Sequence, residues 1–207
     1  MASLHLTPEV PLRRDVDLDW ALSRTGNGYR VKGMFLTPLV KQLGSAWEAL
    51  SKQLDHPPRM GRYLPFNDYP QRDMTRLMYH LGKREFPGVS AFEAFRRLSR
   101  NDFGVFAAST LGRVVLSTIR DPVTALLKLP EVYVKVAPGE WSFAAEQLAS
   151  DRVDLRFGPA PGIWGAQLGQ VEAIVQYFRA DPEIEVRLEG ERDDHVRFSI
   201  RCVSTRR

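Results

Sequence analysis

The sequence has one cysteine, Cys202, among its 207 residues, which excludes an internal disulfide and a cysteine cluster for metal. Cys202 falls on the apolar side of an alternating segment, so we interpret it as a buried structural thiol. Histidine is also scarce, and no histidine has a second one or a cysteine at ligand spacing: His5, His56, His80 and His195. We therefore expect no metal site and no cofactor, and the cytoplasm is the simplest location.

Other signatures are missing as well. No apolar run approaches the roughly 18 residues of a membrane-spanning helix, and residues 1–19 lack the apolar core of a signal peptide. There is no phosphate-binding loop, no dinucleotide fingerprint and no Gly-x-Ser-x-Gly motif. The segment 158–162 is rich in glycine, but its two prolines remove backbone donors that a phosphate would need. We predict no membrane span, no catalytic residues and no enzymatic activity.

Charge does not single out a partner. The 29 basic and 25 acidic residues are interleaved, and they leave a net charge of only +4. Arg96, Arg97 and Arg100 form a local cluster, but no basic stripe alternates with aromatics and no zinc-finger spacing is present. The charges are typical of a solvated surface, and we predict no nucleic-acid partner.

The clearest pattern present is alternation in the last sixty residues. Apolar and charged side chains alternate over 152–157, 183–189 and 196–202, which is typical of antiparallel strands with one wet face. A segment with helical periodicity separates the first two, and 142–148 can add another strand. We therefore predict an antiparallel sheet crossed by one helix, with six side chains sharing one buried face: Val153, Leu155, Ile184, Val186, Phe198 and Ile200.

Proline and glycine divide the first part of the chain. Residues 1–28 read as an irregular arm and 29–35 as a short strand. Thr37 followed by Pro38 predicts a helix start, with apolar spacing carrying that helix to about Asp55. Residues 56–67 read as a loop rich in proline and glycine.

The middle of the chain reads as helices. Asp68 is expected to cap a helix that Gly82 interrupts and that 86–88 ends. Ser90 and Glu93 then form a capping box.

Two more helices follow, over 103–119 and from Asp121-Pro122 to Pro130. We predict a single α+β domain over 29–203, in which helices at 37–135 precede a sheet-and-helix part at 142–203.

A few aromatic and arginine side chains are candidates for a ligand-binding pocket. Aromatics supply contact area, and arginine can hold an anionic group with two hydrogen bonds. The alternative, which we favour, is that the aromatics seal a core and the arginines pair with carboxylates. The candidate residues are Tyr69, Arg72, Arg97, Arg113 and Trp164.

Four short motifs carry a family resemblance. They are Val31–Phe35, Asp68–Pro70, Phe95–Leu98 and Ala107–Arg113. Over about residues 29–203 the chain resembles a myxobacterial paralogous family of uncharacterised proteins of this length. The resemblance implies no activity.

The order of elements suggests a wider relationship. Helices, then strands, a helix and a final hairpin are similar to the heme nitric-oxide/oxygen-binding fold, vinyl-4-reductase-type domains and TRAPP tethering subunits. The resemblance implies a sensor or adaptor with an internal apolar cavity. The heme-binding branch has a Tyr-x-Ser-x-Arg motif and a proximal histidine. Here the matching segments are Val153–Phe157, which lacks the motif, and Thr124–Pro130, which has no histidine. The departures predict a chain without heme.

Three functions remain open from the sequence. The first is a non-enzymatic sensory module that holds a small apolar or amphipathic molecule, with a protein partner or a homodimer as further options. The second is an interaction module with a filled core. The third is an enzyme whose site is assembled only in space.

Overall fold

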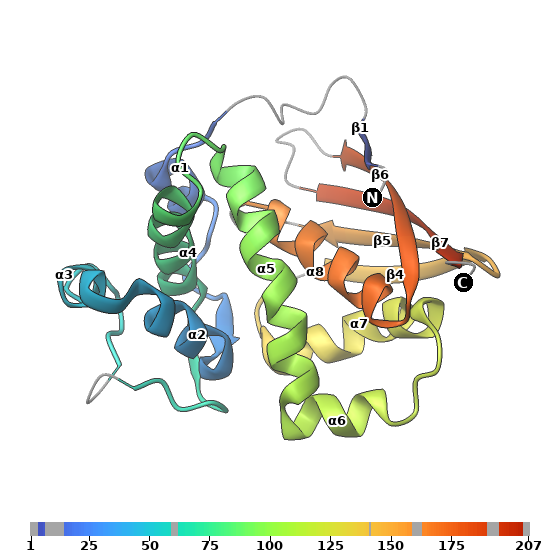
Figure 1. Cartoon of the computed structure of the whole chain (residues 1–207), viewed down its shortest axis with the longest axis horizontal. Coiled ribbons are helices and arrows are strands. Elements are labelled where there is room, and N and C mark those ends of the chain that lie inside the picture. The colour runs from blue at the N-terminus through green and yellow to red at the C-terminus, as the bar shows by residue number, and fades with distance from the viewer. Residues whose placement is uncertain are drawn as a thin grey trace.

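The computed structural model describes residues 4–6, 15–58, 62–140, 142–158, 163–189 and 195–204. Helices occupy one side of the molecule and a five-stranded sheet the other, with α5 and α8 between them (Figure 1). The helices are α1 Leu18–Ser23, α2 Gly33–Leu43, α3 Trp47–Ser51, α4 Gln71–Glu85, α5 Ala91–Ala108, α6 Thr110–Leu116, α7 Pro122–Val136 and α8 Gly165–Tyr177, with a 3-10 turn at Gly44–Ala46. The predicted α+β class with a C-terminal sheet crossed by a helix is confirmed.

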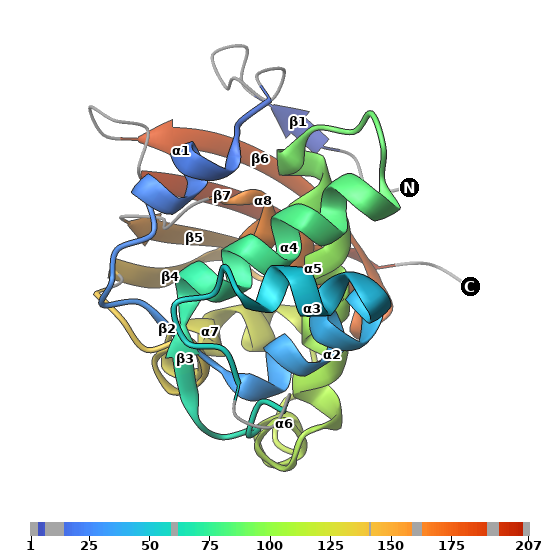
Figure 2. The same ribbon diagram turned by 90° about the vertical axis from the view of Figure 1, so that its left-hand side faces the viewer.

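The large sheet has the strand order β1-β6-β7-β5-β4. Its strands pair antiparallel except for β1 and β6, which run parallel. Their bounds are β1 Leu4–Leu6, β4 Ser142–Ala149, β5 Arg152–Gly158, β6 Ala180–Glu189 and β7 His195–Ser204. A second sheet of two short strands, β2 Arg30–Lys32 and β3 Asp68–Pro70, lies among the helices (Figure 2).

The buried face of the large sheet is the one that alternation predicts. Leu155 lies opposite Phe198, which in turn lies opposite Val186 on the next strand. All six predicted residues are at most 2% exposed, and α8 covers them with its own apolar side chains. On the other face charges pair across strands, as Arg201 does with Glu183 at 3.6 Å. Asp154 departs from the pattern, because it lies on this outer face and is 5% exposed.

The N-terminal segment differs from the expected irregular arm. The carboxylate of Asp17 accepts a hydrogen bond from the Trp20 backbone N–H at 2.7 Å and caps α1. Residues 4–6 add a parallel strand to the edge of the sheet. β1 forms because it pairs with the distant strand β6. Its three residues are too few to show a periodic pattern in the sequence.

α2 begins four residues before the predicted cap. The Gly33 and Met34 backbone N–H groups donate to the carbonyl oxygens of Asn67 and Pro65, at 3.0 and 3.1 Å. The loop thus satisfies donors that a capping side chain would otherwise meet. Thr37 donates instead to the Gly33 carbonyl, and Pro38 lies inside the helix. The single helix expected to reach Asp55 is broken at Gly44, whose φ is +55°.

The predicted cap and interruption of α4 are also wrong. Asp68 lies in β3, where it forms an ion pair with Lys32 at 2.7 Å, and α4 begins only after Pro70. The helix continues through Gly82 to Glu85. A Cβ at Gly82 would lie 2.8 Å from the Cβ of Ala94, so this glycine permits close packing of α4 on α5.

The predicted helix starts after Ser90 and Asp121 are confirmed, but the helix ends differ from the prediction. Ser90 and Asp121 cap α5 and α7 by accepting from backbone N–H groups three residues on, at 3.3 and 2.8 Å. α5 is continuous to Ala108, so no helix spans 103–119; Ser109 caps the separate helix α6. α7 passes through Pro130 to Val136, because packing on its neighbours outweighs one missing hydrogen bond. Among the described residues, no helix has the length and apolar character needed to cross a membrane.

Candidate functional site

A cavity of about 100 Å³ lies between α4, α5, α7 and α8; α6 and the start of α2 add to its wall, and it is partly open to the surface. Its wall is mainly apolar. The apolar lining comes from Val31, Phe35, Met74, Met78, Phe95, Phe103, Phe106, Val115, Leu116, Ile119, Ala125, Leu129, Val132, Val136, Ala137, Ile163, Ala166 and Ile174. Native interiors are packed as densely as organic crystals, so a space of this size is a feature to be explained.

A chain of hydrogen bonds forms the polar part of the wall. The Gln170 side-chain amide donates to a carboxylate oxygen of Asp102, with Nε2 and Oδ2 3.1 Å apart. The hydroxyl of Tyr133 donates to the carbonyl oxygen of the same Gln170 side chain. The three residues come from α5, α8 and α7, so the chain joins three walls of the cavity.

The electrostatics of this polar part follow from burial. Asp102 is 7% exposed, and burial raises the pKa of its carboxyl to about 6, opposed in part by the hydrogen bond from Gln170. Burial also raises the pKa of the Tyr133 hydroxyl, so it keeps its proton and acts as a donor. Gln167 is 6% exposed, and its side-chain oxygen has no hydrogen-bond partner among the described residues.

Helix periodicity explains why these groups meet. Gln167, Gln170 and Ile174 follow one another at spacings of three and four, so they share the face of α8 that lines the cavity. Asp102 and Phe106 share a face of α5 in the same way.

The two helices that carry Asp102 and the glutamines, α5 and α8, are held together by a tight seam. A Cβ on Gly165 would lie 2.3 Å from the carbonyl oxygen of Phe92, and one on Gly169 would lie 2.0 Å from that of Arg96. Only glycine allows the backbones of α5 and α8 to approach this closely.

A buried ion pair reinforces the seam. Glu172 is fully buried, and its carboxylate binds Arg96 and also Arg100, the latter with 2.8 Å between Nη2 and Oε2. Both arginines come from α5, so the pair ties α8 to its neighbour beside the cavity. The walls that carry Asp102 and Gln170 are therefore fixed relative to each other.

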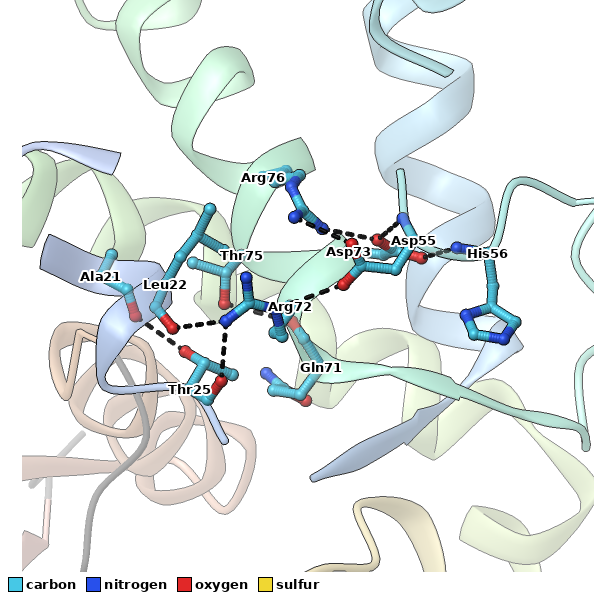
Figure 3. Close-up of polar contacts among 10 residues, drawn as sticks. All are labelled: Ala21, Leu22, Thr25, Asp55, His56, Gln71, Arg72, Asp73, Thr75 and Arg76. Carbon is cyan, nitrogen blue, oxygen red and sulfur yellow. Dashed lines mark hydrogen bonds and ion pairs between the residues drawn. The ribbon is translucent and has the colours of Figure 1, made fainter. Parts of the chain in front are cut away.

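Polar contacts also fix the opposite wall, at the start of α4 (Figure 3). The buried Asp73 carboxylate accepts from the backbone N–H groups of Asp55 and His56, at 2.7 and 2.9 Å. Arg76 binds both carboxylates, and its hydrogen bond holds the pKa of Asp55 below the usual value. The contacts secure the helix that contributes Met74 and Met78 to the cavity wall.

Two of the predicted site residues lie near this wall without lining the cavity. Arg72 donates to the backbone carbonyls of Leu22 and Thr25 and pairs with Asp55, so it ties α1 to α4 (Figure 3). The Tyr69 hydroxyl accepts from the Leu64 backbone N–H at 2.9 Å.

The other three predicted residues lie farther away. Arg97 is exposed and pairs with Glu93, and Arg113 is exposed on α6. Trp164 is buried against Phe92 at the start of α8. The structure does not bring the five predicted residues together, and as ligand-binding residues they stay predictions.

The residues that line the polar part of the cavity were not identified from the sequence. Nothing marks Asp102, Gln167 and Gln170 in a linear reading, because isolated polar residues in a helix usually face water. One signal was available: Glu172 is the only charged residue among the thirteen of α8. A helix with so few charges is typical of one that is buried on all sides, and its polar side chains then face other protein groups or a ligand.

The resemblance to a heme-binding fold can be tested on this cavity. A space of about 100 Å³ is well below the roughly 300–1,000 Å³ of ordinary cofactor pockets. The described wall contains no histidine or cysteine, and its Tyr133 hydroxyl is engaged by Gln170. No group of three or more metal-binding side chains occurs among the described residues either. The residues do not fit heme.

Comparison with known protein families finds one match. A family model described as a protein of unknown function (DUF2378) matches residues 24–201. No curated protein matches the chain.

Solved structures of H-NOX proteins match most of the chain. An H-NOX protein from S. oneidensis in the Fe(II) state has a TM-score of 0.68 at 16% identity, and an Fe(II) unliganded one from K. algicida has 0.63 at 17%. Each comparison covers 84% of this chain and 97% of the other. An oxygen-binding H-NOX domain related to soluble guanylate cyclases scores 0.60 at 17% identity, covering 84% and 95%. At such identities the likeness establishes the fold.

Proposed function

The chain belongs to the DUF2378 family, and from its fold and its cavity we propose that it is a sensory module that binds a small, largely apolar molecule in place of heme. The cavity between α4, α5, α7 and α8 carries the proposal. An unfilled space of about 100 Å³ with a mainly apolar wall gives up packing contacts that a filled interior would make. A binding role accounts for that cost.

The size of the cavity limits the ligand. An apolar cavity of about 150 Å³ is large enough for benzene. A ligand for the present cavity therefore has about four or five non-hydrogen atoms, most of them apolar, in keeping with the wall.

A binding role is favoured over an enzymatic one by the way the ionisable groups are arranged. Asp102 and Tyr133 both reach the cavity, but the Gln170 amide lies between them and bonds to each. An amide separates the two groups and is a poor proton carrier, so they do not form an acid–base pair. The alternative, an interaction module, predicts a core filled by side chains. The cavity does not match that expectation. A protein partner, a homodimer, a cytoplasmic location and a myxobacterial origin stay predictions.

Native mass spectrometry of the gently purified chain tests the proposal, followed by organic extraction of whatever is bound. We expect a bound small molecule, or saturable uptake of an added one such as 2-methylbutane. Ala125→Leu fills the cavity from α7 and should abolish uptake. Ala49→Leu is the control, because Ala49 is exposed on α3. A wild-type chain that takes up nothing, or an Ala125→Leu variant that binds as well as wild type, would contradict the proposal.

A further inference from the structure

Two acceptors among the polar groups that line the cavity lack donors. The Asp102 carboxylate accepts a hydrogen bond from Gln170, has the Ser99 hydroxyl beside it, and has no ion-pair partner among the described residues. The Gln167 side-chain oxygen is buried and has no partner there either. A buried acceptor without a donor costs free energy, and a buried carboxylate without a cation costs more.

The two acceptors lie at one end of the cavity. Gln167 and Gln170 are three residues apart on the face of α8 that lines it, and Gln170 contacts Asp102 directly. Tyr133 adds no free donor there, because its hydroxyl already donates to Gln170.

The cation in the described wall does not reach this end. Lys128 lines the cavity from α7, but its ammonium group pairs with Glu131 at 2.9 Å, and both side chains are at least half exposed. The charge of Lys128 is therefore balanced at the surface, and that of Asp102 is not balanced inside.

We propose that the ligand of this cavity is a small organic ammonium ion, with an apolar body of about four carbon atoms among Met78, Phe95 and Phe103 and its –NH₃⁺ group between the Asp102 carboxylate and the Gln167 side-chain oxygen. The inference rests on the proposed function. An ammonium group supplies three donors and a positive charge, which is what these two acceptors lack. The apolar body matches the rest of the wall.

Three probes of nearly equal shape separate charge from size: isobutylamine, isobutanol and 2-methylbutane. NMR titration at pH 7.5 of the full chain gives the dissociation constant of each. We expect isobutylamine to bind at least about tenfold more tightly than isobutanol, since hydrogen bonds to a charged group are stronger than neutral ones. Asp102→Asn should remove most of that preference and change the affinity for 2-methylbutane less than about twofold.

The control is Asp151→Asn in the turn between β4 and β5, where the exposed carboxylate pairs with Arg201; it should leave all three affinities unchanged. If 2-methylbutane binds but isobutylamine binds no better than isobutanol, the ammonium ligand is wrong and the cavity remains a binding site. If the Asp102→Asn variant keeps the full preference for the amine, the role of this carboxylate is wrong. If no probe binds, the proposed function fails together with the inference.

Discussion

Helix α8 meets two different environments. Along the seam with α5, two glycines bring backbones into contact and Glu172 is held by two arginines. On the cavity side, the same helix leaves a space of about 100 Å³ and presents Gln167 with an unpartnered oxygen. The seam is packed for stability, whereas the cavity side gives up stability. Proteins accept such costs where function requires them.

The contrast can be tested by substitutions on the two sides of α8. Changes at the seam should destabilise the fold, because no space is left there. Changes that remove the charge of Asp102 or fill the cavity should stabilise the fold and reduce ligand binding.

The largest effect is expected at the seam. Gly169→Ala places a methyl group 2.0 Å from the Arg96 carbonyl oxygen, so the helices must separate. We expect the free energy of unfolding to fall by about 3 kcal/mol or more, measured by urea denaturation. Gly104→Ala is the matched control, since Gly104 lies exposed in α5 with nothing near its Cβ position, and it should gain about 0.5–1 kcal/mol. Equal effects at the two glycines would remove the distinction between seam and surface.

The cavity side should respond to pH through Asp102. Its pKa is about 6 in the folded state against 3.8 when exposed, so the folded state retains a proton that the unfolded state has lost. The contribution of Asp102 to stability is therefore greatest below about pH 4 and declines as pH rises to about 6. Asp102→Asn removes this decline, so its stability relative to wild type should rise over that range by on the order of 3 kcal/mol.

Urea denaturation at several pH values measures this difference. Asp55→Asn should show the opposite pH dependence, because hydrogen bonding to Arg76 lowers the pKa of Asp55 in the folded state. This variant should lose more stability relative to wild type at pH 7 than at pH 3. A difference between Asp102→Asn and wild type that stays constant from pH 4 to 7 would contradict the account.

A smaller effect is expected at the buried ion pair. Glu172→Gln removes the buried carboxylate that holds Arg96 and Arg100 against α8, and should cost about 2 kcal/mol. Glu146→Gln, which breaks an exposed pair with Arg156, should cost less than about 0.5 kcal/mol. Thermal unfolding measures the loss of stability of each variant. Similar losses would mean that the buried position of Glu172 contributes no extra stability.

The sheet could be predicted because its pattern is local. In the strands around Leu155, Val186 and Phe198, each second side chain faces the core, so alternation fixes both the strand and its buried face. The helix ends could not be predicted in this way. Gly33 begins α2 because loop carbonyls from residues 65 and 67 meet its first N–H groups, and those contacts are distant in sequence.

The helix ends predicted from proline and glycine were wrong for a related reason. Pro130 and Gly82 would end isolated helices, but here tertiary packing carries α7 and α4 past them. The cavity was predictable only as an implication of the fold resemblance. Its polar residues, Asp102, Gln167 and Gln170, become visible as a group only when α5 and α8 are brought together.

The most direct test of the central claim uses methionine methyl groups as reporters. Met74 and Met78 line the cavity, whereas Met34 is also buried but lies outside its wall. In a ¹³C-methyl NMR titration with 2-methylbutane, we predict saturable shifts at Met74 and Met78, none at Met34, and none at all in Ala125→Leu. Unchanged Met74 and Met78 signals, or shifts of equal size at Met34, would contradict the account.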